Sequence, residues 1–115
     1  MSPEARRDFP VPVRVEVRRG SGQTRTEYAV NLSGGGLCLH AREALDEGEE
    51  LDLGLELPPD GPRLEARGRV VWVSRHTATD TAPRFWEVGV RFLEVATAHR
   101  ERIEGWARQP IDRRR

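Results

Sequence analysis

The stretch Asn31-Leu32-Ser33-Gly34-Gly35-Gly36 joins two short segments of alternating apolar residues, 26–30 and 37–40, so it marks the junction of two strands. Three consecutive glycines allow positive φ angles and let another group approach the backbone closely. Residues two apart in an extended chain share a face, so Asn31 and Ser33 are expected to present an amide and a hydroxyl together. The same residues also fit a glycine-rich hairpin connection closed by an Asx or Ser turn, and the stretch alone leaves both interpretations open.

Outward from this junction, apolar and polar residues alternate with a period of two, which predicts strands with one buried face. The pattern occurs in six segments, at residues 10–18, 24–32, 36–41, 51–57, 64–74 and 85–95. In the second segment it predicts Thr26, Tyr28, Val30 and Leu32 on one side. Gly68, inside the fifth segment, predicts a bulge or sharp bend of the kind that a closing barrel needs.

The period changes near residue 96. Ala96, His99/Arg100, Ile103 and Trp106/Ala107 recur at helical spacing there and predict a short, narrow amphipathic helix. Gly105 costs this helix ~1 kcal/mol relative to alanine, so we expect Trp106 to hold it against the sheet. Six strands joined by short turns and followed by one helix predict an all-β fold. A small antiparallel barrel is favoured because closure removes exposed strand edges.

Composition limits the function. With 115 residues and 33% charged side chains, the chain is expected to form one domain with a small core. The formal net charge is zero, which argues against a nucleic-acid partner. All 19 basic side chains are arginine, so a Walker-type phosphate loop and Schiff-base chemistry are excluded. Cys38 is the only cysteine, and we find neither a signal peptide nor a segment long enough for membrane insertion, so a cytoplasmic protein is expected.

Little in the sequence suggests an enzyme. Cys38 and His40 share a strand face, but two ligands alone do not make a metal site, so no metal and no cofactor are expected. No histidine is placed to activate Ser33 in a recognisable motif. Trp72 is expected in the core or at the barrel rim, and Trp86 is a candidate for an exposed contact surface.

Four pieces of the sequence together resemble the PilZ domain, the bacterial receptor module for cyclic di-GMP. Asn31, Ser33 and Gly36 match the family pattern Asp/Asn-x-Ser-x-x-Gly. Residues 6–13 resemble its arginine motif and Val-Pro-Val-like strand start, and residues 68–73 and 89–92 resemble its later strands. The resemblance covers roughly residues 6–106. It implies a flexible basic arm at 1–9, a six-stranded PilZ barrel with a closing helix at 10–108, and a disordered basic tail at 109–115.

The resemblance also implies a ligand site for cyclic di-GMP made of Arg6, Arg7, Asn31, Ser33 and Gly36. The arginine arm would fold over the dinucleotide, Asn31 and Ser33 would meet a guanine edge, and Gly36 would spare the base a clash. Because a lone PilZ domain has no output module, the ordered arm would signal through an unidentified protein effector.

One departure from the family pattern leaves a second function open. The last arginine of the motif falls at Pro10, which carries no charge and donates no hydrogen bond. Since a bidentate arginine contact is worth ~1–3 kcal/mol, its loss weakens or abolishes binding. The alternative is a degenerate PilZ domain that binds no cyclic di-GMP and acts by protein contact, with the acidic segment 43–52 docking a basic partner.

Overall fold

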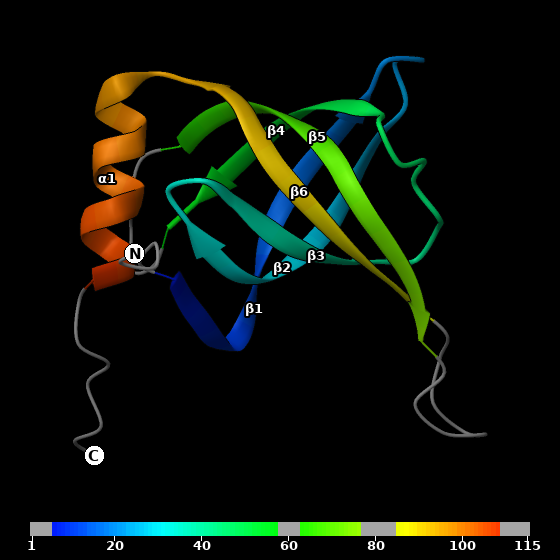
Figure 1. Ribbon diagram of the computed structural model, residues 1–115, viewed down its shortest axis with the longest axis horizontal. Helices are drawn as coiled ribbons and strands as arrows, with labels where there is room; N and C mark the ends of the chain where they lie inside the picture. Colours follow the sequence, from blue (N-terminus) through cyan, green and yellow to red (C-terminus); the bar gives the residue numbers. More distant parts are fainter. Residues whose placement is uncertain (1–5, 58–62, 77–84, 109–115) are drawn as a thin grey trace.

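The computed structural model describes residues 6–57, 63–76 and 85–108, and it is a closed β-barrel with one helix at its end (Figure 1). The elements are β1 (Arg6–Arg19), β2 (Thr24–Ser33), β3 (Gly36–Ala41), β4 (Glu50–Glu56), β5 (Arg63–His76), β6 (Phe85–Val95) and α1 (Thr97–Arg108). The strands are ordered β1-β2-β3-β6-β5-β4, and all neighbouring strands are antiparallel. The predicted six-stranded antiparallel barrel with a C-terminal helix is confirmed.

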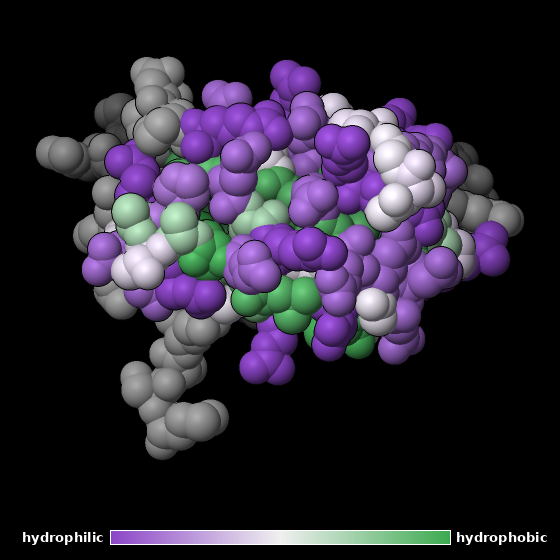
Figure 2. All heavy atoms as spheres, turned by 90° about the horizontal axis from the view of Figure 1, so that it is seen from above, coloured by the Kyte–Doolittle hydropathy of each residue, from purple (hydrophilic) through white to green (hydrophobic). Residues whose placement is uncertain are grey.

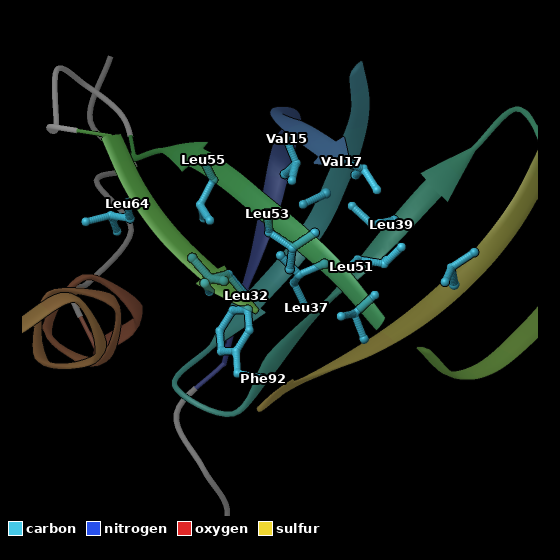
Figure 3. Packing of buried hydrophobic residues seen from close by; sticks show 14 of the residues in the cluster. Val15, Val17, Leu32, Leu37, Leu39, Leu51, Leu53, Leu55, Leu64 and Phe92 are labelled. Carbon is cyan, nitrogen blue, oxygen red and sulfur yellow. The ribbon is translucent and has the colours of Figure 1, made fainter. Parts of the chain in front are cut away.

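Branched aliphatic side chains fill the barrel because alternate residues of every strand point inward. Leu32, Leu53 and Phe92 converge on the interior from β2, β4 and β6 (Figure 3). Helix α1 stands at one end of the barrel, where Ile103 is fully buried and Trp106 is 8% exposed (Figure 1). Burying side chains of this size stabilises the fold by about 1.5–3 kcal/mol each. The expected docking of the helix through Trp106 is therefore confirmed.

Strand β2 does not keep the alternation that its sequence predicts. Glu27, Ala29 and Leu32 are buried, whereas Tyr28 is 44% exposed. The pairing of β2 with β3 shifts between Ala29 and Asn31, so one extra residue reverses which side chains face the interior. The prediction that Tyr28 shares a face with Leu32 is wrong for this reason.

A larger irregularity lies opposite this bulge, in β1. Asp8 pairs with Asn31 and Val13 with Ala29, so residues 9–12 lie opposite Val30 alone. Pro10 falls in this irregular stretch, where a missing N–H costs no ladder hydrogen bond. Figure 1 shows β1 turning sharply there. The strand begins at Arg6, earlier than the expected start at residue 10.

The bend predicted at Gly68 is confirmed, because the β5–β6 pairing shifts between Arg67 and Gly68 and again between Val70 and Trp72. On the outside, hydrophilic side chains surround small, separate apolar areas on the face seen in Figure 2. None of the helices in the described ranges is long and apolar enough to cross a membrane. Residues 1–5 of the expected arm and the tail at 109–115 lie outside the described residues.

Candidate functional site

Strand pairing aligns two rows of outward-facing residues across β2, β3, β6 and β5. The first row is Asn31, Cys38, Gly89 and Trp72. The second row is Ser33, Gly36, Arg91 and Arg69. The neighbours that alternate with them, such as Leu32, Leu37 and Val90, are buried in the barrel. Asn31 and Ser33 therefore share an outer face, as the sequence predicts, and the bulge at Val30 is what turns them outward.

The rows border two adjoining hollows that meet at Gly36 and Val90. The first has a volume of about 340 Å³, and its lining includes Asn31, Ser33, Gly89 and Trp72. The second has a volume of about 560 Å³ and is lined by Gly35, Gly36, Val90, Arg91, Phe92 and Arg100. Together they form a shallow, partly cationic surface with glycine at its floor.

Trp72 lies on this surface instead of in the core. Its side chain is 42% exposed, which excludes the core position, one of the two that the sequence allows. A Cβ atom added to Gly89 would lie 2.1 Å from the indole Nε1, so the ring sits directly over this glycine. The flat indole is thus held beside Asn31 by the absence of a side chain at residue 89.

The connection between β2 and β3 is also a Ser turn. The Ser33 Oγ accepts a hydrogen bond from the Gly35 N–H at 3.2 Å, so the turn interpretation of the sequence is confirmed. None of the three glycines has a positive φ. Gly36 is instead needed for close approach, because a Cβ there would lie 2.1 Å from the Val90 carbonyl oxygen. Gly36 therefore has a structural role in the β3–β6 pairing that does not depend on a ligand.

Helix α1 holds the same turn from the other side. Arg100 donates a hydrogen bond from Nη1 to the Gly34 carbonyl at 2.6 Å. The Glu104 side chain packs on Gly34, where an added Cβ would lie 2.6 Å from the Glu104 Cγ. The Phe92 N–H donates to the Gly35 carbonyl at 2.8 Å. These contacts fix the turn against both α1 and β6.

Strand β1 brings the arginine motif beside this turn. The backbone of Arg6 lies opposite Ser33, Arg7 lies opposite Leu32, and Asp8 lies opposite Asn31. The side chains of Arg6 and Arg7 lie outside the part of the chain that the structure describes, so their predicted ligand contacts stay predictions. The backbone pairing nevertheless brings all five predicted site residues to one edge of the barrel.

Protein groups surround Cys38 and His40 in the structure. Cys38 is a buried thiol that forms no disulfide, and His40 Nε2 lies 3.3 Å from the Glu87 carboxylate. The His40 ring stacks against Phe85 with 4.5 Å between centroids. In residues 6–57, 63–76 and 85–108 no three histidine, cysteine or acidic side chains are grouped to hold a metal.

Sequence reasoning missed Arg91 and Arg100, and left Trp72 unassigned. Arg91 belongs to the alternating pattern of β6, which predicts only that it faces outward. Its position opposite Gly36 depends on the pairing of β3 with β6, two strands that are far apart in sequence. Nothing in the sequence indicates which helix residue reaches the glycine turn.

Comparisons with known proteins agree with this geometry. The family model of the PilZ domain matches residues 3–109. No curated protein matches the chain. The PilZ domain with c-di-GMP of YcgR from Escherichia coli superposes with a TM-score of 0.73 at 18% identity, covering 90% of this chain and 86% of that one.

Two longer proteins share the fold. The Bacillus subtilis inhibitor of motility MotI/DgrA has a TM-score of 0.75 at 16% identity, covering 92% of this chain and 48% of its own. The K. pneumonia MrkH–c-di-GMP complex has a TM-score of 0.76 at 17% identity, covering 91% and 50%. The chain thus spans about half the length of each of these two proteins. The structural likeness establishes the fold, and the match over almost its whole length shows that this chain belongs to the PilZ domain family.

Proposed function

We propose that this protein is a receptor for cyclic di-GMP, which binds over the two hollows beside the β2–β3 turn. The observation that carries the proposal is the convergence of Asn31, Ser33 and Gly36 on one outer face, with the backbone of Arg6 paired directly to Ser33. Two of the similar structures named above are of PilZ proteins with c-di-GMP.

The chemistry of the face suits this ligand. Cyclic di-GMP carries two guanines, each with O6 and N7 acceptors, and two phosphates. Asn31 offers an amide donor, and the exposed indole of Trp72 offers a stacking surface worth about 1–3 kcal/mol per base. Arg6 and Arg7 would supply guanidinium groups that both pair with guanine and neutralise phosphate. Because the backbone of residues 6–8 is already paired with β2, binding would fix the side chains of Arg6 and Arg7 over the ligand, and a protein effector would recognise the surface so formed.

A second candidate is a PilZ module that binds no nucleotide and acts by protein contact. Pro10 in place of the motif arginine favours it. The acidic segment gives it less support than the sequence suggests, because arginines of the same chain pair with several of its carboxylates. Glu49 binds Arg19, and Glu43 binds Arg25. A basic partner would have to displace these arginines.

Calorimetry at a protein concentration of ~100 μM tests the proposal, since this range detects micromolar affinities. We expect the wild type to bind cyclic di-GMP, and Ser33→Ala and Asn31→Ala to weaken binding about tenfold or more. Ser21→Ala is the matched control, because this serine lies in the exposed β1–β2 turn. Binding by Pro10→Arg alone, with no heat from the wild type, would contradict the proposal and favour the second candidate.

A further inference from the structure

Arg91 differs from the paired arginines of the barrel in its cross-strand neighbours. Its neighbour on β3 is Gly36, which has no side chain, and its neighbour on β5 is another arginine, Arg69. The side chain of Arg91 is exposed and makes no hydrogen bond or ion pair with any residue that the structure describes. Like charges directly across two strands are destabilising, so this position has an electrostatic cost that an anion would remove.

Two carboxylates on neighbouring strands are engaged elsewhere, and Glu104, which packs on Gly34, does not line the hollow beside Arg91. Glu50 binds Arg69 at 3.2 Å and Arg67 at 2.9 Å, and Glu87 lies 3.3 Å from His40. Among the described residues that line the hollow of about 560 Å³ beside Arg91, none is acidic. Within the described parts of the chain, the guanidinium of Arg91 therefore shares this hollow with no carboxylate.

Arg100 adds a second cation to the lining of this hollow. Its hydrogen bond from Nη1 to the Gly34 carbonyl, at 2.6 Å, fixes the guanidinium at the edge of the hollow. A guanidinium carries five N–H donors in a fixed fork, so this single bond leaves others for an anion. Two arginines around a hollow floored by glycine match the oxygens of a phosphate group in charge and in geometry.

We infer that Arg91, supported by Arg100, binds a phosphate of the nucleotide from the β6 side of the β2–β3 turn. The inference rests on the proposed function, because the adjoining hollow with Asn31 and Trp72 would hold the attached base. Strand order places β1 on one side of the turn and β3 followed by β6 on the other. In β1, Pro10 stands where the family motif has an arginine, so one positive charge is missing on that side of the turn. Arg91 supplies a positive charge from the opposite side, on β6.

The test compares Arg91→Ala and Arg91→Lys with Arg102→Ala, by calorimetry with cyclic di-GMP. Arg102 is an exposed arginine of α1 without a partner among the described residues, so it controls for the loss of one positive charge. We expect Arg91→Ala to weaken binding about 10- to 100-fold, as for a charge-assisted hydrogen bond. Arg91→Lys should lose less, because it keeps the charge but not the fork. Arg102→Ala should stay within about twofold of the wild type.

Each outcome separates the inference from the proposed function. The phosphate contact would be overturned if the Arg91→Ala variant bound cyclic di-GMP as tightly as the Arg102→Ala variant while the Ser33→Ala variant bound it more weakly. The receptor function would then still stand. If neither the wild type nor the Pro10→Arg variant binds cyclic di-GMP, the inference and the proposed function are both overturned. Titration with inorganic phosphate, followed by NMR of the arginine side chains, separates the two sources of the anion. Saturation of Arg91 by phosphate alone at low millimolar concentration, without competition from cyclic di-GMP, would also overturn the inference.

Discussion

Two outer faces of the barrel use arginine in opposite ways. On the face formed by β1, β4 and the first half of β5, arginines meet carboxylates across the strands: Arg63 binds Glu16 at 2.9 Å, and Arg67 binds Glu50 at 2.9 Å. On the face formed by β2, β3 and β6, Arg91 meets glycine on one side and arginine on the other. Arg63 and Arg67 are thus paired with carboxylates on the first face, whereas Arg91, beside the proposed ligand site, has no such partner among the described residues.

The difference extends to the glycines. On the paired face, the guanidinium of Arg63 covers Gly54, where an added Cβ would lie 2.4 Å from the Arg63 Cζ. On the site face, Gly36 faces the backbone of β6 and Gly89 lies beneath an aromatic ring. Substitutions on the two faces should therefore fail for different physical reasons, and the following experiments sharpen that contrast.

Gly36→Ala should have the largest effect on stability. The new Cβ would meet the Val90 carbonyl oxygen at 2.1 Å and the Arg91 Cα at 3.1 Å, and backbone cannot rotate away as a side chain can. We expect a loss of about 3 kcal/mol or more in the free energy of unfolding, measured by urea denaturation. Gly105→Ala is the control with the opposite sign, because nothing lies within 4 Å of its added Cβ and alanine favours the helix by about 1 kcal/mol. A stable Gly36→Ala protein would show that the site face does not need close strand approach.

Arg19→Ala should follow, on the paired face. Arg19 binds Glu49 through two hydrogen bonds of 2.6 and 2.8 Å, and both side chains are mostly shielded from solvent. We expect a loss of about 1–2 kcal/mol at pH 7. The exposed Arg18 provides the matched control, and Arg18→Ala should change stability by less than about 0.5 kcal/mol.

This pair also sets a pH dependence. The hydrogen bond from Arg19 lowers the pKa of the Glu49 carboxyl below its usual value. The stabilisation is therefore present above the ordinary glutamate pKa of about 4.3 and is lost as the pH falls through the lower, folded-state pKa. The stability difference between the wild type and Arg19→Ala should shrink in urea titrations at pH 3. A difference that is unchanged there would contradict this account of the pair.

Gly89→Ala should lower the free energy of unfolding by less than Gly36→Ala or Arg19→Ala does. The atoms that its added Cβ would meet belong to a side chain, which can move, and not to the backbone. The added Cβ would displace the Trp72 indole from its place over β6. We expect a stability loss of about 1 kcal/mol, a change in tryptophan emission, and about tenfold weaker binding of cyclic di-GMP. Unaltered binding despite a displaced indole would remove Trp72 from the proposed site.

Glu27→Gln should have the smallest effect, and it should stabilise the protein. Glu27 is only 3% exposed, and burial raises the pKa of its carboxyl despite a backbone hydrogen bond from Arg42. A carboxyl whose folded-state pKa is raised contributes stability below its unfolded pKa and loses it as the pH rises through the folded value. Glutamine keeps the hydrogen-bond acceptor without the charge. It should therefore raise the melting temperature at pH 7.5 but not at pH 4, with Glu47→Gln as the exposed control.

The fold could be predicted from sequence because period-two patterns and turn residues act locally. All six strands and the helix overlap the predicted segments, although β1 begins at Arg6 instead of residue 10, and the outward pair Asn31 and Ser33 follows from the same spacing. The phase of β2 before Asn31 could not be predicted, because the bulge that reverses it depends on pairing with β3 and β1. Arg91 was missed for a related reason: its neighbours Gly36 and Arg69 belong to distant segments that meet only when the barrel closes.

The bulge at Val30 has a consequence for protein engineering. It sets the rotation of everything that follows it on β2, so Leu32 fills the core while Asn31 and Ser33 reach solvent. A designer who keeps Val30 in a regular strand, without the irregular stretch of β1 opposite it, would turn Asn31 and Ser33 inward and expel Leu32. Exposing a leucine in place of the polar pair would create an aggregation risk without altering any residue of the motif.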